Sequence, residues 1–432
     1  MTDLLNNLST LVSIPSVLDK PQKNAPFGKA NRQALEFVLE LARYMGFDTY
    51  NGDGYYGYID WTAMCRIGSP AIIGILGHLD VVPDTEYKLT QKDGILYGRG
   101  VVDNKGPVLC VLEAMNKLKQ SGYKPRSTIR LILGCNEESG SKCIERYRAE
   151  QAIPKASFVP DADFPVVISE MGILHLKVTL NIVGLKKSGI TINGGERANV
   201  VPSYCEVTIN NAQFSMLNAQ LKGEFDFFQD DKLTKLTFHG KSAHAMCPHK
   251  GDNAIVKALN MLTKHSLLPT PYPLFPIQYK DESGEQTINL GIIKTNGDTI
   301  EMTFDLRCPA TQDIEKLKDK IKTAFASAYP MVTLTQLHFA PPLKANPNST
   351  LVRSLLDAYT SVTGLPAAHI KTGGGTYARA LPNAVAFGPT FPDQITNIHE
   401  PNECISLDHL SKLVEIYKGA IVNLDKNRGE FL

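Results

Sequence analysis

The chain has 432 residues, of which 43% are hydrophobic and 21% are charged. These proportions are typical of a globular protein and exclude disordered, collagenous and coiled-coil classes. The 45 lysine and arginine residues balance 44 aspartate and glutamate residues, so the formal net charge of +1 indicates neither nucleic acid nor an anionic membrane as a partner. The length exceeds what one hydrophobic core usually serves, which predicts at least two domains.

The cysteines and the N-terminal segment indicate a cytoplasmic protein. The eight cysteines are scattered and form no CxxC pair, so we expect reduced, mostly buried thiols. Residues 1–17 contain no basic region followed by an apolar run, and the apolar stretch 71–76 is too short to span a bilayer. We therefore expect a cytoplasmic location and no membrane partner.

The first part of the chain has the pattern of an α/β domain. Apolar residues recur at three- and four-residue steps across 31–45, which predicts an amphipathic helix that ends at Gly46. The apolar runs 71–77 and 129–134, with a helical segment at 108–118 between them, predict buried strands joined by a helical crossover.

The middle of the chain has a different order of elements. This order is βαββαβ, which is typical of a ferredoxin-like unit. Further strand-like segments at 173–180 and 189–209 precede the unit. The unit comprises a strand at 233–238, a helix at 253–264, hairpin strands at 287–294 and 299–306, a helix at 313–328 and a strand at 332–338.

The end of the chain again has the α/β pattern of the first part, because the apolar run 384–388 predicts another buried strand. The sequence therefore predicts an α/β domain with a mixed central sheet flanked by helices, interrupted by an inserted α+β domain that contains the ferredoxin-like unit. The predicted limits are 1–173 and 343–432 for the interrupted domain and 174–342 for the inserted domain.

Five polar clusters carry the candidate chemistry, and the first three directly follow predicted strands, where open α/β sheets bind ligands. Singly, each cluster has an ordinary explanation as a turn, a helix start or a hydrogen-bonded histidine. Together they form a mixed nitrogen and oxygen set that suits Zn²⁺, Mn²⁺ or Co²⁺ and is large enough for two ions. The clusters are GHLDVVP (77–83), GRGVVDNKG (98–106), CNEESG (135–140), PDAD (160–163) and NIHE (397–400).

Two spacings within these clusters suit metal-assisted hydrolysis. Glu137 and Glu138 are consecutive, so their side chains point in different directions, and one can bind a metal while the other acts as a base. Asp80, two residues after His78, is placed to accept the second imidazole N–H and to orient the ring. The motifs of a P-loop, a dinucleotide fold, HExxH and a GxSxG nucleophile are incomplete, which favours an activated water as the nucleophile.

These clusters, in this order, resemble the motifs of metallopeptidase family M20. The resemblance runs over nearly the whole chain and implies a zinc-peptidase-like catalytic domain with an inserted lid domain. Four further segments are similar to the PepV/Sapep-like branch of bacterial dipeptidases: APFG (25–28), GYYGYI (54–59), SAHA (242–245) and GGGTYAR (373–379).

The resemblance implies a ligand set for two metal ions. Asp103 would bridge the ions, His78 and Asp161 would complete one site, and Glu138 and His399 would complete the other. Zn²⁺ is the expected ion, with Mn²⁺ and Co²⁺ as alternatives.

Two positions in these motifs bear on the ligand set, one as an alternative ligand and one as a departure from the family pattern. Asp163 is the alternative to Asp161, and the position after Pro160 favours Asp161. Asn104 departs from the family, which often has a second aspartate after the bridging one.

The resemblance also implies catalytic and substrate-binding roles. Glu137 would be the general base and Asp80 the residue that orients His78. The lid would supply His244 to stabilise the oxyanion, although His239 and His249 are equal candidates on the sequence alone. Arg307 and Asn199 would hold the C-terminal carboxylate of the substrate. Gly374, in the run 373–375, would let the substrate approach the backbone closely, and a simple turn is the alternative explanation of this run.

The implied reaction is hydrolysis of unblocked dipeptides. Glu137 would take a proton from a water that bridges the two ions and would then protonate the departing amine. One alternative is an N-acyl-amino-acid deacylase such as succinyl-diaminopimelate desuccinylase, and another is a catalytically silent binding protein. We expect a small-molecule substrate and no nucleic acid partner. A monomer is favoured over a homodimer because the large inserted region can supply His244 within one chain.

Overall fold

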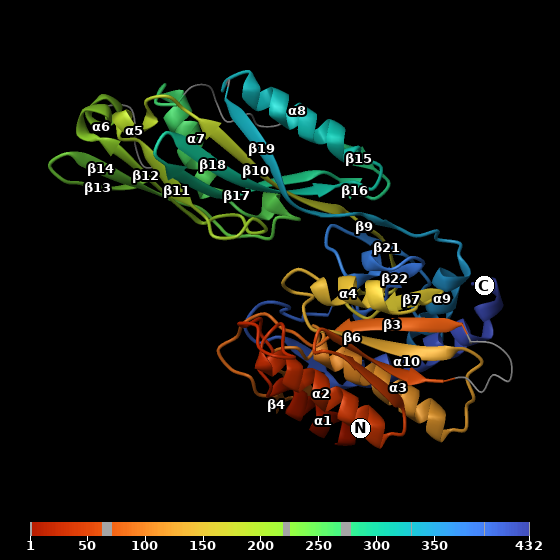
Figure 1. Ribbon diagram of the computed structural model, residues 1–432. Coiled ribbons are helices and arrows are strands. Elements are labelled where there is room, and N and C mark those ends of the chain that lie inside the picture. The colour runs from red at the N-terminus through yellow and green to blue at the C-terminus, as the bar shows by residue number, and fades with distance from the viewer. Residues whose placement is uncertain are drawn as a thin grey trace. The chain divides into compact units, whose positions relative to one another are not determined.

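A computed structural model describes residues 2–62, 71–218, 225–268, 278–329, 331–392 and 394–431. The chain forms two compact units, each with its own sheet and helices (Figure 1). Unit 1 comprises Met1–Ser169, Leu343–Lys371 and Gly375–Leu432, and unit 2 comprises Glu170–Pro342 and Thr372–Gly374. Unit 2 therefore interrupts unit 1 in sequence.

Unit 1 is built on a mixed nine-stranded sheet. The sheet agrees with the predicted α/β pattern, because apolar runs form its centre and helices accompany it (Figure 1). In spatial order the sheet contains β1 (Asp48–Gly52), β2 (Tyr56–Trp61), β6 (Thr128–Gly134), β3 (Ile72–His78), β7 (Ala156–Val159), β22 (Ala384–Ala386), β9 (Val167–Glu170) and β20 (Leu343–Lys344), and β21 (Ile370–Thr372) pairs with β9.

The centre of this sheet is parallel and buried. Strand β3 pairs in parallel with β6 and β7, and β22 pairs in parallel with β7. All residues of β6 and nearly all of β3 are buried, which explains why these strands read as continuous apolar runs rather than as alternating ones. Parallel strands end at the same edge, so the polar segments that follow them meet there.

The helices of unit 1 follow the predicted periodicity. The predicted 31–45 helix is α2, whose apolar face is buried and which ends before Gly46, a glycine with φ 77°. The helices are α1 (Thr2–Val12), α2 (Lys29–Tyr44), α3 (Lys105–Gln120), α4 (Lys142–Glu150), α9 (Thr350–Thr363) and α10 (Leu407–Lys426), with 3₁₀ turns at Tyr377–Ala380 and Arg428–Glu430.

Two small sheets complete unit 1. One pairs β8 (Ala162–Asp163) with β23 (Pro389–Thr390), and the other has the order β24 (Cys404–Ser406), β5 (Ile95–Tyr97) and β4 (Thr90–Lys92). The β24–β5 pairing joins segments about 300 residues apart, because Cys404 pairs with Tyr97. This pairing brings the late histidine motif next to the loop of Asp103.

Unit 2 contains an antiparallel sheet with helices. In spatial order the strands are β13 (Asp226–Gln229), β14 (Leu233–His239), β12 (Tyr204–Asn210), β11 (Thr191–Gly194), β17 (Thr287–Asn296), β18 (Thr299–Cys308), β10 (Gly172–Asn181) and β19 (Val332–Ala340). The remaining elements are α5 (Leu185–Ser188), α6 (Asn211–Asn218), a 3₁₀ turn at Pro248–Lys250, α7 (Ala254–Lys264), α8 (Ile314–Ala326) and the small pair β15 (Lys280–Asp281) and β16 (Gly284–Glu285).

The ferredoxin-like unit is present, but its predicted first strand is wrong. The predicted strand at 233–238 is β14, which pairs with β12 and β13. The place of the first strand is taken by β10, which lies between β18 and β19. Helix α8 then connects β18 and β19, which flank β10, as a split βαβ requires. Helix α7 precedes β17, which lies on the other side of β18 from β10. Local alternation could not reveal this, because β10 and β14 alternate equally well and only long-range pairing distinguishes them.

A short glycine segment also departs from the predicted limits. Residues 372–374 were expected in the interrupted domain but belong to unit 2. Two hydrogen bonds to unit 2 residues explain this, because the backbone N–H of Met171 donates to the carbonyl of Thr372 and the guanidinium of Arg307 donates to the carbonyl of Gly373.

The thiols agree with the sequence expectation where they are described. The seven described cysteines form no disulfides, and all except Cys247 are buried. Cys65 lies outside the described residues. Among the described helices, none combines the length and the apolar character that crossing a bilayer requires.

Candidate metal centre

The candidate ligands converge at the carboxyl edge of the parallel strands in unit 1. His78 is the last residue of β3, Glu138 follows β6, and Asp161 follows β7. Asp103 lies in the loop before α3, and His399 lies in the loop before β24. All five belong to unit 1, so the segments on either side of unit 2 in the sequence share one site.

The carboxylate of Asp103 lies between the two imidazoles. Its Oδ1 atom is 2.9 Å from Nε2 of His78, and its Oδ2 atom is 2.8 Å from Nε2 of His399. One oxygen therefore faces each histidine, which is the arrangement that a carboxylate shared by two ions needs.

The other carboxylates crowd the same imidazoles. Oδ2 of Asp161 is 3.5 Å from Nε2 of His78, and Oε1 of Glu138 is 3.1 Å from Nε2 of His399. Ligand atoms of His78, Asp103 and Glu138 lie within 4.8 Å of one another, as do those of His78, Glu137 and Asp161. These residues and His399 thus form one cluster of six, in which Glu137 lies within 4.8 Å of His78 and Asp161 but farther from His78 than Asp103 does.

The tautomer of His78 indicates that a cation fits this cluster. Nδ1 of His78 lies 2.9 Å from the backbone carbonyl oxygen of Asp80, which can only accept, so Nδ1 carries the proton. In the neutral ring, Nε2 would present a lone pair toward the carboxylates of Asp103 and Asp161; burial lowers the pKa of His78, but these carboxylates raise it well above its usual value. This buried nitrogen receives no hydrogen bond from the part of the chain that the structure describes. A lone pair facing carboxylates is repulsive unless a cation lies between them, so the residues present fit a divalent metal.

Asp80 contacts His78 mainly through its backbone carbonyl rather than through its side chain. Its carboxylate is 3.5 Å from Nδ1 of His78, farther than its own backbone carbonyl. The carboxylate instead accepts hydrogen bonds from the backbone N–H groups of Glu137, at 3.0 Å, and Glu138, at 3.1 Å. The main chain of Asp80 thus orients the imidazole, while its side chain holds the two glutamates.

The pKa values in the cluster reflect its excess of carboxylates. Desolvation raises the pKa of Glu137 well above its usual value; His78 opposes this rise, and the charges of Asp161 and Glu138 add to it. Burial alone would lower the pKa of His399, but hydrogen bonds to Asp103 and Glu138 raise it to about 11. The carboxylates therefore favour positive charge throughout the cluster, as a cation site must.

Asn104, which departs from the family pattern, is a structural part of this site. Its side chain is fully buried, and Oδ1 accepts a hydrogen bond from the backbone N–H of His78 at 3.3 Å. Its Nδ2 group donates to the carbonyl of Pro160 at 2.5 Å and to Oδ1 of Asp161 at 3.2 Å. A neutral amide can make all three contacts because it both donates and accepts, so it orients Asp161 without adding a charge.

The structure distinguishes Asp161 from Asp163. Asp161 belongs to the cluster, whereas Asp163 is exposed in the short strand β8. The geometry therefore favours Asp161 as the ligand.

Tyr377 supports the site and was missed by the sequence analysis. Its buried ring packs edge-on to His78, with centroids 6.3 Å apart, and its hydroxyl lies 2.8 Å from Sγ of Cys143. No local signal distinguishes it, because a tyrosine in a glycine-rich segment gives no indication of the ring that it contacts.

His244, predicted to stabilise the oxyanion, and Asn199, predicted to bind substrate, adjoin each other within unit 2. Val200, next to Asn199, forms an isolated β-bridge with His244, and the backbone N–H of Ala245 donates to the carbonyl of Asn199. Of the alternatives to His244, His239 forms an exposed ion pair with Asp226 at 2.9 Å. Asn199 and His244 therefore lie on neighbouring loops.

The other two predicted substrate residues, Arg307 and Gly374, meet through Gly373. Arg307 donates to Gly373 at 3.0 Å and forms a bidentate pair with Asp305, at 2.7 and 3.0 Å. Both side chains of this pair are buried. Asp305 thus holds the guanidinium in a fixed orientation.

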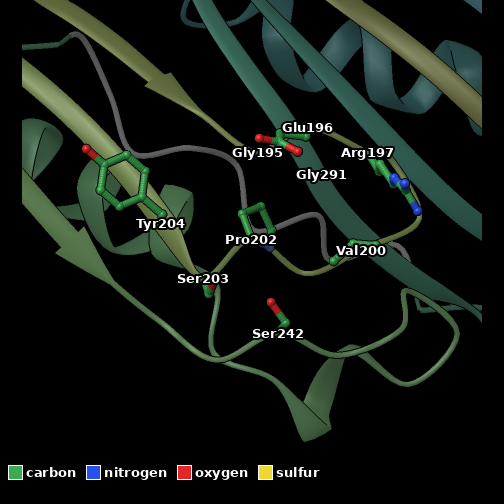
Figure 2. A pocket seen from close by; sticks show the side chains of 9 residues that line it. All are labelled: Gly195, Glu196, Arg197, Val200, Pro202, Ser203, Tyr204, Ser242 and Gly291. Atoms are coloured by element: carbon green, nitrogen blue, oxygen red, sulfur yellow. The ribbon is translucent and has the colours of Figure 1, made fainter. Parts of the chain in front are cut away.

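Unit 2 also contains a pocket of about 470 Å³ beside the loop of Asn199 (Figure 2). The pocket combines charged and hydroxyl side chains. Its lining residues are Gly195, Glu196, Arg197, Val200, Pro202, Ser203, Tyr204, Ser242 and Gly291.

The imidazole–carboxylate cluster at the carboxyl edge of the unit 1 sheet has the donor set of a metal site. Comparison with protein families agrees, because residues 74–423 match the model of peptidase family M20/M25/M40. The chain belongs to this family, as its sequence motifs predicted.

Relatives and solved structures match along almost the entire chain. The Bacillus subtilis (strain 168) protein named "Putative dipeptidase YtjP" is 30% identical, over 98% of this chain and 97% of that protein. Human carnosine dipeptidase 1 has a similar fold, with a TM-score of 0.62 and 14% identity over 98% of this chain and 96% of that chain. The M20 family metallo-carboxypeptidase Sso-CP2 from Sulfolobus solfataricus also has a TM-score of 0.62, with 16% identity over 99% and 100% of the two chains. These likenesses confirm the predicted fold class.

Proposed function

We propose that the protein is a dipeptidase that uses two divalent metal ions to hydrolyse unblocked dipeptides. The observation that carries this proposal is the position of the Asp103 carboxylate. Its Oδ1 atom faces the imidazole of His78 and its Oδ2 atom faces the imidazole of His399, and other carboxylates surround both rings. The relatives named as dipeptidases support the choice of substrate.

The proposed ligands are Asp103 for both ions, His78 and Asp161 for one ion, and Glu138 and His399 for the other. Zn²⁺ suits this mixed set best, and Mn²⁺ or Co²⁺ would also fit. Bound ions would supply Lewis acidity, which lowers the pKa of water and polarises the scissile carbonyl.

Glu137 is proposed as the general base. Desolvation raises its pKa, so its carboxylate can accept a proton from water and later return it to the departing amine. Asp80 holds the backbone of Glu137 through a hydrogen bond of 3.0 Å, which fixes the point from which the base acts. Glu137 also lies within reach of His78 and Asp161, so metal content has to be measured along with turnover when it is replaced.

The residues of unit 2 are proposed to bind and stabilise the substrate. His244 would donate a hydrogen bond to the oxyanion, and Arg307 and Asn199 would hold the C-terminal carboxylate of the dipeptide. Gly374 would let the dipeptide approach the backbone closely. Asp305 supports this role because its bidentate contact orients the guanidinium of Arg307. We further propose a cytoplasmic monomer.

Steady-state assays of the metal-loaded protein with Ala-His and with N-succinyl-diaminopimelate test the proposed substrate class. We expect kcat/KM to favour the dipeptide by about 100-fold or more, because polar groups arranged for one substrate reject another that leaves them unpaired. Hydrolysis of the acylated substrate alone would identify a deacylase instead. Hydrolysis of neither substrate would favour a catalytically silent binding protein.

A further inference from the structure

A buried ion pair outside the proposed ligand set connects the loops that carry the ligands. Arg99 lies in the loop that leads to Asp103, and Glu403 lies in the loop that follows His399. Nη1 of Arg99 is 2.9 Å from Oε2 of Glu403, and the two side chains are 3% and 0% exposed. Burying two charges is costly, so a buried ion pair is weak evidence for a role in stability.

The carboxylate of Glu403 holds the backbone of the Asp103 loop. Its Oε1 atom accepts hydrogen bonds from the N–H groups of Val102 at 2.8 Å and Asp103 at 3.0 Å. Its Oε2 atom accepts from the N–H of Gly100 at 3.0 Å in addition to Arg99. Both oxygens are therefore bound by donors of one short segment that ends at Asp103.

The guanidinium of Arg99 reaches two further loops. Its Nη2 group donates to the backbone carbonyl of Glu400 at 3.1 Å, next to His399. The same nitrogen lies 3.2 Å from Oδ2 of Asp84, in the loop that follows β3 and its terminal residue His78. One side chain thus connects the loops of His78, Asp103 and His399.

His399 depends on such support because its own surroundings are open. Its side chain is 49% exposed, and its backbone has φ 64°, a left-handed conformation that is uncommon for a residue with a side chain and that surrounding contacts must hold. The contact of Arg99 with the carbonyl of Glu400 holds the adjacent peptide.

We propose that Arg99 and Glu403 are positioning residues of the metal centre, which hold Asp103 and His399 where one ion can bind both. This inference rests on the proposed metal centre. Groups that orient metal ligands from outside the ligand set typically change metal affinity by about 10–100-fold when replaced.

The test is a titration of the metal-free protein with Co²⁺. Calorimetry measures the affinity, and visible absorption reports the geometry around the bound Co²⁺. In Glu403→Gln, one oxygen becomes an NH₂ group that cannot accept from the loop, so we expect Co²⁺ affinity to fall about 10–100-fold and the absorption bands to shift. In Arg99→Lys the charge remains but the planar fork is lost, so we expect a smaller loss of affinity in the same direction. Because Arg99→Lys keeps a cation opposite Glu403, it still tests the proposal if Glu403→Gln does not fold.

Asp60→Asn is the matched control. Asp60 forms a bidentate pair with Arg130, at 2.7 and 2.8 Å, toward the other end of β6 from the cluster. We expect this variant to lower Tm but to keep the affinity and the spectrum of the unaltered protein. If Glu403→Gln and Arg99→Lys behave as Asp60→Asn does, the pair is only structural and the proposal is wrong. If the unaltered protein itself binds no Co²⁺, the proposed metal centre fails, and this proposal fails with it.

Discussion

Glu137→Ala is expected to lower kcat for dipeptide hydrolysis by about 10²–10⁴-fold, the usual contribution of a general base, while the bound metal content stays unchanged. The reason is that Glu137 is proposed to move a proton rather than to bind an ion, and Asp80 would still hold the backbone at this position. Turnover and metal content, measured on the same preparation, check this expectation.

Two further variants sharpen the Glu137 experiment. Glu137→Gln keeps the size and polarity of the side chain and removes only its ability to accept a proton, so we expect it to be as inactive as the alanine variant. Glu145→Ala removes an exposed glutamate from α4 and should leave both turnover and metal content unchanged. Loss of metal from both Glu137 variants would show that this carboxylate is a ligand, and retained turnover would exclude it as the base.

Asp103→Ala is expected to lose bound metal as well as activity. Removing this carboxylate separates the two halves of the cluster, because its oxygens lie 2.9 Å from His78 and 2.8 Å from His399. The loss of affinity should exceed the roughly 10–100-fold that replacement of a group outside the ligand set costs. Metal analysis after gel filtration, together with calorimetric titration, measures the effect.

Asp163→Ala is the matched control for Asp103→Ala and also tests the choice between the two aspartates of the PDAD motif. Asp163 is exposed and lies outside the cluster, so this variant should bind metal as the unaltered protein does. Normal metal binding by Asp103→Ala would overturn the proposed bridging role. Loss of metal from Asp163→Ala would instead identify Asp163 as a ligand.

Local patterns in the sequence were sufficient to predict most of the elements that position the site. The apolar runs that became β3 and β6 are buried on both faces, and the α2 periodicity reflects one buried stripe. The predicted first strand of the ferredoxin-like unit was wrong because strand order depends on pairing between distant segments, which alternation within a strand does not encode.

The candidate site could be predicted as a set of residues but not as a set of contacts. The spacing of His78 and Asp80 suggested a contact between their side chains, whereas the backbone carbonyl of Asp80 is closer to the ring. Glu403 lies only four residues after His399, yet its contacts with the Asp103 loop arise from pairing of β24 with β5. Such contacts follow from the tertiary fold rather than from motif spacing.

The most direct test of the proposed chemistry is to remove metal with a chelator, add Zn²⁺ back in measured amounts, and follow Ala-His hydrolysis against bound metal. We expect the metal-free protein to be inactive and activity to reach its maximum as bound Zn²⁺ approaches two ions per chain. Full hydrolysis by the metal-free protein would contradict the proposed use of metal, and maximal activity at one bound ion would contradict the proposed pair.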